Sequence, residues 1–247
     1  MFETFFGFKK TPFVDSPDAK QLFASEGWRQ VNTRLELLTR HPGVGLLTGE
    51  VGAGKSTAAR VFTASLNPNL YKILYVHFTN GSALDLLRQI SAAIVHLNQS
   101  KKQHPILICD EAHLLPHPAL EQLPLLLNFD MDSARLLTLL LIGQPLLRRV
   151  LLLQIHEPLR QRIGVHYHLE GLTRPELDAY LAQQLKAAGF TQPLFDETAR
   201  QGLYQVTKGI PRLVNKLALT ALRLAAERKV QIVDEAVLLD ATTEALL

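Results

Sequence analysis

A glycine-rich run carries the clearest chemical signal in this sequence. The pattern G-x-x-x-x-G-K-[ST] is matched by Gly49-Glu50-Val51-Gly52-Ala53-Gly54-Lys55-Ser56. Glycines at these positions let successive backbone N–H groups curl around an anion at a helix N-terminus, where the helix dipole favours negative charge. An apolar segment, 44–48, precedes the run and an Ala-rich segment follows it, which is the strand-to-helix context that such a loop needs. The run therefore predicts a nucleotide-binding site.

The side chains that end this run have expected roles toward a nucleotide. We expect Lys55 to reach the β and γ phosphates, Ser56 to ligate Mg²⁺ and Thr57 to bond the α phosphate. The loop backbone would surround the phosphates through Gly49, Glu50, Val51, Gly52, Ala53 and Gly54. The alternative is a Gly-rich turn that fits the pattern by accident, which the flanking strand and helix signals disfavour.

Two carboxylates follow a second apolar segment, 106–109. In an open parallel sheet, ligands bind at the carboxyl ends of the strands, and Asp110 and Glu111 stand at such an end. We expect Asp110 to hold Mg²⁺ through water, and Glu111 to orient and deprotonate the water that attacks the γ phosphate. Taken alone, the pair fits an ordinary strand exit with solvated acids. Beside a phosphate loop it indicates ATP hydrolysis.

Other polar residues near these carboxylates need their own interpretation. The letters Asp110-Glu111-Ala112-His113 also match the box of a helicase family, but such helicases need a second RecA-like domain, for which this chain has no room. We therefore interpret His113 as a helix-start residue. Gln144 follows an apolar segment and is expected beside the strand of Asp110, where it would sense the γ phosphate or position water.

Apolar runs alternate with helical patterns over the first two thirds of the chain. Such alternation predicts an α/β fold with a parallel five-stranded sheet flanked by helices. The expected strands are Val44–Thr48, Ile73–Phe78, Ile106–Cys109, Leu136–Gly143 and Val165–Leu169. The segment 82–99 leaves room for one helix between the second and third strands.

After residue 169 the strand signals stop and helix signals take over. The predicted helix starts are Thr173, with Glu176 completing a capping box, Asp196, Pro211 and Asp234. We therefore expect a nucleotide-binding domain over residues 1–171, including an N-terminal linker, and a small all-α lid domain over residues 172–247.

The composition is typical of a globular chain without disulfides. Hydrophobic residues make up 47% of the chain, and no stretch reaches the roughly 18 apolar residues that a membrane span needs. The single cysteine, Cys109, lies in an apolar run, so the cytoplasm is the expected location, without membrane association. The formal net charge of +3 is compatible with nucleic acid but does not establish it.

Three arginines stand where a nucleotide could be contacted. Arg160 and Arg162 precede the last expected strand, and an isolated pair of this kind is usually surface charge. Arg212 opens the third helix of the lid, where a cation opposes the helix dipole. A bound nucleotide is an anion that would compensate.

Together, the phosphate loop, the Asp-Glu strand, the polar sensor, the paired arginines and the Gly-x-Pro-Arg lid resemble those of the AAA+ ATPases. More narrowly, the chain resembles the ExeA-like branch in Phe5-Phe6-Gly7-Phe8, Pro12-Phe13, Leu47-Thr48-Gly49-Glu50-Val51-Gly52 and Gly143-Gln144-Pro145. This branch includes secretion and pilus ATPases, and proteins encoded beside transposases that are related in role to TnsC, MuB and IstB.

The resemblance implies an ATP- and Mg²⁺-dependent hydrolase that forms a homo-oligomer, either a ring or a filament. It implies that Arg162, or alternatively Arg160, is an arginine finger for a neighbouring subunit. It also implies that Pro12 and Phe13 lie against the adenine, although hydrophobic packing explains the N-terminal aromatic residues equally well. In the transposition relatives the region around 82–99 helps to line the DNA path, and its shortness here means that no DNA-contact residues are transferred.

Three functions follow as expectations. The leading one is a cytoplasmic ATPase that oligomerises on double-stranded DNA and recruits or activates a transposase. The alternative is an ATPase of secretion or pilus assembly. The third is a signalling switch that depends on nucleotide occupancy, against which Glu111 argues, because such a switch needs no water-activating base.

Overall fold

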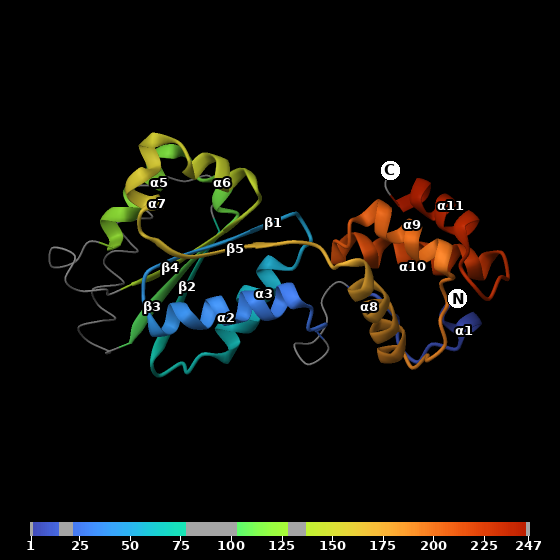
Figure 1. The fold of residues 1–247 in the computed structure, drawn as a ribbon. Coiled ribbons are helices and arrows are strands. Elements are labelled where there is room, and N and C mark those ends of the chain that lie inside the picture. Colours follow the sequence, from blue (N-terminus) through green and yellow to red (C-terminus); the bar gives the residue numbers. More distant parts are fainter. Residues whose placement is uncertain (1, 15–21, 78–102, 128–136, 246–247) are drawn as a thin grey trace. The chain divides into compact units, whose positions relative to one another are not determined.

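The computed structural model describes residues 2–14, 22–77, 103–127 and 137–245, which divide into two units (Figure 1). One unit, here called the sheet unit, comprises residues 28–50 and 55–169. The other, the helical unit, comprises residues 1–27, 51–54 and 170–247. The division into domains at residues 171 and 172 stays a prediction, and the N-terminal residues 2–13 pack with the C-terminal helices. The expected helix over 82–99 lies outside the described residues.

The sheet unit contains a five-stranded parallel sheet with the strand order β2-β3-β4-β1-β5. Its strands are β1 (Val44–Gly49), β2 (Tyr71–His77), β3 (His104–Asp110), β4 (Thr138–Gly143) and β5 (Ile163–Leu169). The predicted α/β fold with a parallel five-stranded sheet is therefore confirmed. Strands β2, β3 and β5 each begin two residues earlier than the apolar runs suggested.

Helices cover both faces of this sheet (Figure 1). One face carries α2 (Glu26–Arg40) and α3 (Lys55–Ser65), and the other carries α5 (His117–Gln122), α6 (Leu146–Leu151) and α7 (Glu157–Arg160). Three short 3-10 helices accompany them: η3 (Ala112–Leu114), η4 (Leu123–Leu127) and η5 (Gln154–His156). Because both faces are covered, the central strands β3 and β4 are buried almost throughout, which explains their continuous apolar sequences.

The helical unit contains α1 (Phe2–Phe6), α8 (Arg174–Ala187), α9 (Glu197–Thr207), α10 (Pro211–Glu227) and α11 (Glu235–Ala245). The predicted capping residues begin these helices. Oε2 of Glu176 accepts from the N–H of Thr173 at 2.9 Å, and Oδ1 of Asp196 accepts from the N–H of Ala199 at 2.7 Å. Oδ1 of Asp234 likewise accepts from the N–H of Val237 at 2.9 Å.

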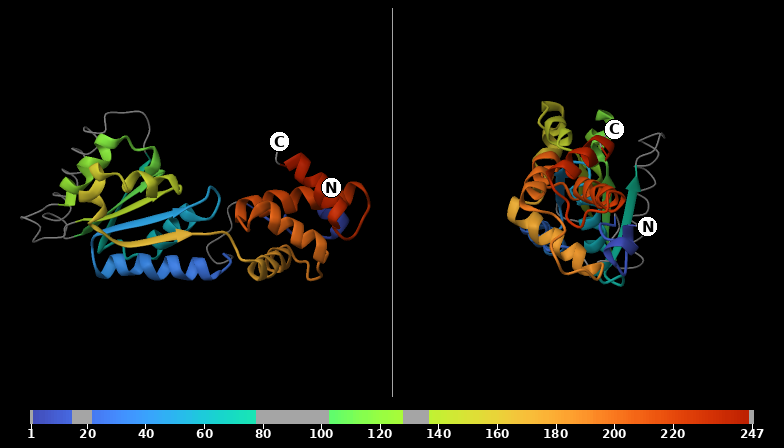
Figure 2. Two further views of the ribbon diagram at one scale, coloured as in Figure 1. Left: turned by 45° about the horizontal axis from the view of Figure 1, so that its top comes forward. Right: turned by 90° about the vertical axis from the view of Figure 1, so that its right-hand side faces the viewer.

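The N-terminal aromatic residues belong to the core of this helical unit. Helix α1 lies against α10 (Figure 2). Phe13 is 2% exposed and packs edge-on against Phe195, with ring centroids 6.2 Å apart. Phe8 makes a similar edge contact with Phe190 at 5.6 Å. Hydrophobic packing therefore accounts for the burial of Phe13 in this unit.

Candidate nucleotide-binding site

The phosphate loop joins the end of β1 to the start of α3. At three of its glycines, either the backbone conformation or a close neighbouring atom disfavours any residue with a side chain. Gly52 and Gly54 have φ values of 84° and 104°, which L-residues rarely adopt. A Cβ on Gly49 would lie 2.4 Å from the carbonyl oxygen of Leu169, so no side chain fits there. The loop conformation thus requires the glycines that the sequence pattern contains.

Lys55 is held by the backbone of its own loop. Its side chain is 6% exposed, and Nζ donates to the carbonyl oxygens of Gly49 and Glu50, both at 2.9 Å. A buried ammonium needs such acceptors, because burial without partners is costly. The charge of Lys55 is therefore held at the loop by two backbone carbonyl oxygens.

Asp110 is the centre of a small hydrogen-bond network. Its carboxylate is 5% exposed, and Oδ2 accepts from the Ser56 hydroxyl and from the Tyr75 hydroxyl, both at 2.8 Å. Oδ1 accepts from the N–H of Glu111 at 2.9 Å. Partial burial beside Asp110, together with the hydrogen bond to that carboxylate, raises the pKa of the mostly exposed Tyr75 to about 12, so this hydroxyl remains a donor. The structure thus brings Ser56 and Asp110 together as the sequence predicted, and adds Tyr75, which the sequence analysis missed.

Glu111 has an unusual backbone and an unsatisfied carboxylate. Its φ of 52° and ψ of 36° lie in the left-handed region, where a non-glycine residue is strained. Its Oε2 is buried and makes no hydrogen bond within the described part of the chain, although Nδ1 of His113 lies 3.3 Å away. Such strain and an unpaired polar atom are features that cluster at functional sites.

His113 connects Glu111 to the end of β4. Its Nδ1 accepts from the backbone N–H of Gln144 at 3.4 Å. A ring nitrogen that accepts this bond cannot also donate to Glu111, which explains why Oε2 has no hydrogen bond. The interpretation of His113 as a helix-start residue agrees with its place in η3 but missed both contacts. Gln144 follows β4, which pairs with β3, as predicted.

Arg160 and Arg162 lie near the amino ends of the parallel strands, whereas the phosphate loop lies at the carboxyl ends. They precede β5, whose first residue pairs with Val44 at the start of β1, whereas the loop follows the end of β1. A strand of this length spans roughly 17 Å. Nη1 of Arg160 donates to the carbonyl of Leu152 at 3.1 Å, and Nη1 of Arg162 donates to that of Pro158 at 2.9 Å.

The remaining predicted site residues belong to the helical unit, apart from Thr57 in α3. Pro12 and Phe13 are buried, and Phe13 has a φ of 58°. The backbone N–H of Arg212 donates to the carbonyl oxygen of Gly52 at 3.4 Å. A Cβ on Gly52 would lie 2.6 Å from Cβ of Arg212, so glycine also permits this close approach.

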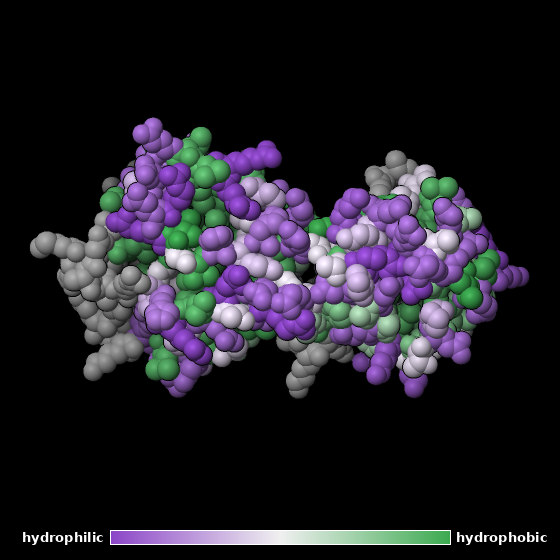
Figure 3. Space-filling view, in the orientation of Figure 1, coloured by the Kyte–Doolittle hydropathy of each residue, from purple (hydrophilic) through white to green (hydrophobic). Residues whose placement is uncertain are grey.

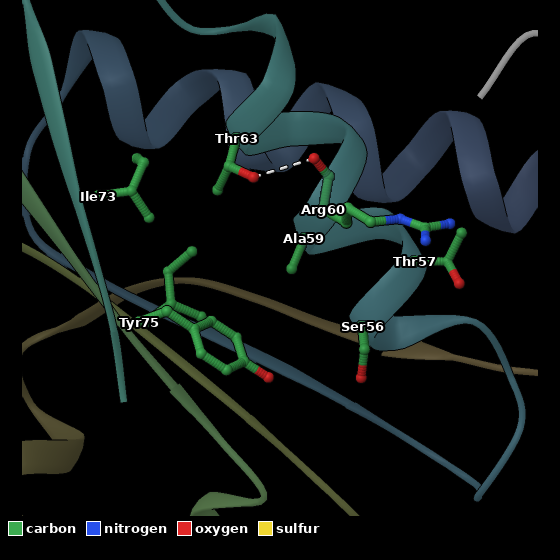
Figure 4. A pocket seen from close by; sticks show the side chains of 8 residues that line it. Ser56, Thr57, Ala59, Arg60, Thr63, Ile73 and Tyr75 are labelled. Carbon is green, nitrogen blue, oxygen red and sulfur yellow. Dashed lines mark hydrogen bonds between the residues drawn. The ribbon is translucent and has the colours of Figure 1, made fainter. Parts of the chain in front are cut away.

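A cavity of about 380 Å³ opens beside the Ser56 and Tyr75 hydroxyls (Figure 4). It lies between α3 and strands β2 and β3. Its lining residues are Ser56, Thr57, Ala59, Arg60, Thr63, Ile73, Tyr75 and Ile108.

Among the described residues, no helix has both the length and the apolar composition required to cross a membrane.

Comparison with known proteins agrees with this geometry. Residues 38–151 match the family described as AAA domain. The chain is 36% identical over 250 residues to general secretion pathway protein A of Aeromonas hydrophila, covering 92% of this chain and 45% of that protein. It is 30% identical over 185 residues to the Holliday junction branch migration complex subunit RuvB of Desulfosudis oleivorans, covering 70% of this chain and 49% of that subunit. The chain thus spans less than half the length of these curated relatives.

Solved structures share the fold. The Thermotoga maritima RuvB Holliday junction branch migration motor aligns with a TM-score of 0.59 at 18% identity, covering 94% of this chain and 73% of that one. Cdc6p from Pyrobaculum aerophilum aligns with a TM-score of 0.65 at 16% identity, covering 98% and 71% respectively. With the AAA domain match, the shared sequence and this common fold, the chain belongs to the AAA+ ATPases.

Proposed function

We propose that this chain binds ATP with Mg²⁺ and hydrolyses the γ phosphate. The observation that carries this proposal is the convergence of Lys55, Ser56 and Asp110 at the carboxyl ends of β1 and β3. AAA+ ATPases bind ATP, generally with Mg²⁺. In this chain Lys55 would contact the β and γ phosphates, Thr57 the α phosphate, and the loop backbone would surround them.

The donor set fits Mg²⁺. The Asp110 carboxylate is buried, and in the described part of the chain it forms no ion pair and accepts only from neutral donors. Ser56 donates its hydroxyl proton to Asp110, which leaves the lone pairs of Oγ available to a cation. Bound Mg²⁺ would neutralise charge that develops on the phosphate oxygens. Ser56 would be a direct ligand, and Asp110 would hold a ligating water.

Glu111 is the proposed base for the attacking water. Its unpaired Oε2 and strained backbone favour this role over that of a solvated strand exit. A carboxylate oxygen without a donor is available to accept a proton from water. Gln144, whose backbone N–H donates to His113, would respond to the γ phosphate. A signalling switch that depends only on nucleotide occupancy would not need this arrangement.

We propose that an arginine from a second copy of the chain completes the ATP site. Arg162, or alternatively Arg160, would stabilise transition-state charge in the neighbouring subunit of a ring or filament. Arg160 is bonded to the loop 152–155, where Leu152, Leu153 and Ile155 are 68%, 48% and 52% exposed. Apolar surface over the α5 to α7 layer is visible in Figure 3. Exposed apolar residues beside arginines suit a protein interface.

Three residues of the helical unit are proposed to contact the nucleotide. By resemblance, Pro12 and Phe13 would lie against the adenine, and Arg212 would contact the phosphates. The contact between Arg212 and Gly52 supports the second assignment, because it ties α10 to the phosphate loop.

The biological pathway has two candidates. The 36% identity to general secretion pathway protein A, over 92% of the chain, favours a role in secretion or pilus assembly. Resemblance to transposition ATPases supports a cytoplasmic regulator that binds double-stranded DNA and a transposase. RuvB is named for Holliday junction migration, and a similar solved structure is Orc1 from Aeropyrum pernix in complex with DNA, with a TM-score of 0.63 at 19% identity.

Paired variants test the proposed site. Lys55→Ala should lose ATP affinity, because it removes a contact made in the ground state, whereas Glu111→Gln should bind ATP and lose turnover. Lys72→Ala removes an exposed lysine from β2 and serves as the charge-matched control. Equal ATP affinity in wild type and Lys55→Ala would contradict the assignment of Lys55 to the nucleotide-binding site.

DNA binding separates the two pathways. Anisotropy of a labelled random duplex, measured with ATP, ADP or no nucleotide, should show ATP-dependent binding if the transposition candidate is right. The affinity should then fall with salt, with a log–log slope near −0.9 for each phosphate neutralised. Absence of binding under all conditions would leave the secretion candidate.

A further inference from the structure

Tyr75 contacts the proposed metal site without belonging to any recognised motif. Its hydroxyl donates to Oδ2 of Asp110 at 2.8 Å, and the same oxygen accepts from Ser56 at 2.8 Å. The two donors come from different elements, β2 and α3, and Asp110 ends β3. One carboxylate oxygen therefore ties three elements together.

The sheet register explains how Tyr75 reaches this oxygen. Tyr75 pairs with Ile108, and Asp110 lies two residues further along β3. Two residues correspond to about 6.6 Å along a strand, a distance that a tyrosine side chain leaning along the strand can span. Figure 4 shows the Tyr75 and Ser56 hydroxyls directed toward the same space.

A packing role alone does not account for this hydrogen bond. Tyr75 is 56% exposed and its ring lines an open cavity, so much of the side chain remains in contact with solvent. An exposed hydroxyl is readily satisfied by water, yet this one donates to a carboxylate that is 5% exposed. Hydrogen bonds to a charged acceptor are stronger than neutral ones and fix its orientation.

We propose that Tyr75 is a positioning residue that orients the Asp110 carboxylate and thereby sets the affinity of the ATP-bound site for its divalent cation. This inference rests on the proposed function. Without Tyr75, Oδ2 would keep a single side-chain donor, and the carboxylate could rotate away from the orientation that suits a metal-bound water. Partners that orient metal-binding groups in this way typically affect metal affinity by about 10-fold to 100-fold.

The test uses Mn²⁺ as a paramagnetic probe and a non-hydrolysable ATP analogue. Loss of the free Mn²⁺ electron spin resonance signal reports cation binding to the complex of the full chain with the analogue. Tyr75→Phe removes only the hydroxyl, and we expect it to raise the half-saturating Mn²⁺ concentration by about 10-fold. Affinity for the fluorescent analogue in EDTA should remain unchanged. Tyr71→Phe, at the other end of β2, is the matched control and should bind Mn²⁺ as wild type does.

A double-mutant cycle shows whether Tyr75 acts through Asp110. In an Asp110→Asn background, Tyr75→Phe should have no further effect on Mn²⁺ binding, because the group that it orients has been changed. Unchanged Mn²⁺ affinity in Tyr75→Phe would overturn the proposed role of Tyr75 and leave the proposed ATPase function standing. A parallel loss of analogue affinity in EDTA would also overturn it, by indicating a general structural effect. If wild type binds no analogue with or without Mn²⁺, the proposed function itself fails.

Discussion

Replacing Glu111 with glycine should stabilise the sheet unit while abolishing ATP hydrolysis. The left-handed backbone at φ 52° and ψ 36° costs a non-glycine residue about 1–2 kcal/mol. Glycine adopts it freely but loses about 0.5–1 kcal/mol more conformational entropy on folding. Removing the buried, unpaired Oε2 recovers about 1–3 kcal/mol. The expected net gain in the free energy of unfolding is therefore about 1–4 kcal/mol.

The single tryptophan provides a local assay for this prediction. Trp28 lies in α2 of the sheet unit, so its fluorescence during urea unfolding reports on that unit. Arg149→Gly, at an exposed position of α6, is the control for the intrinsic effect of glycine and should lose about 1 kcal/mol. Glu111→Gly should shift the urea midpoint upward, in the opposite direction. A midpoint equal to or below that of wild type would refute the idea that Glu111 is strained.

Three further predictions concern packing, assembly and pH. Gly49→Ala should lose about 1–3 kcal/mol of stability, because its Cβ would meet a backbone oxygen at 2.4 Å, whereas Gly43→Ala, with its nearest atom at 3.9 Å, should not; Trp28 fluorescence measures both. Arg162→Ala should be inactive alone but gain ATPase activity when mixed with Lys55→Ala, and a concentration-independent monomeric ATPase would contradict this. Burial lowers the pKa of His104 from 6.5, so the folded chain favours the neutral ring. Stability should therefore be complete above pH 6.5 and decline below it, less steeply in His104→Gln when urea midpoints at about pH 7.5 and about pH 5.5 are compared.

Local signals predicted much of the fold. The apolar runs of β3 and β4 and the capping residues Thr173, Asp196 and Asp234 are determined by near neighbours in sequence, and each marks the element expected. The start of β2 was missed because Tyr71 and Lys72 interrupt the apolar pattern at the edge of the sheet. Edge strands carry polar residues that a search for apolar runs discards.

Contacts between distant segments could not be derived in the same way. The phosphate-loop motif and the acidic pair predicted that Ser56 and Asp110 would meet, because their spacing has a known geometric meaning. Tyr75 joins them only through the register of β2 on β3, which depends on the whole sheet. The contact of His113 with Gln144 depends similarly on how β4 ends beside η3. A polar residue near the carboxyl end of any strand beside Asp110 would have been the signal to follow.

The two carbonyl oxygens that hold Lys55 have a consequence for ligand selection. A molecule that enters the loop must compete with neutral acceptors already bonded to the ammonium at 2.9 Å. Because the ammonium is itself charged, these two bonds are already charge-assisted, and an acceptor that also carries charge, such as an ionised phosphate oxygen, would attract Nζ more strongly. An uncharged amide or sugar hydroxyl offers the ammonium nothing better than it already has. We therefore expect the loop to favour anionic ligands over neutral ligands of similar size.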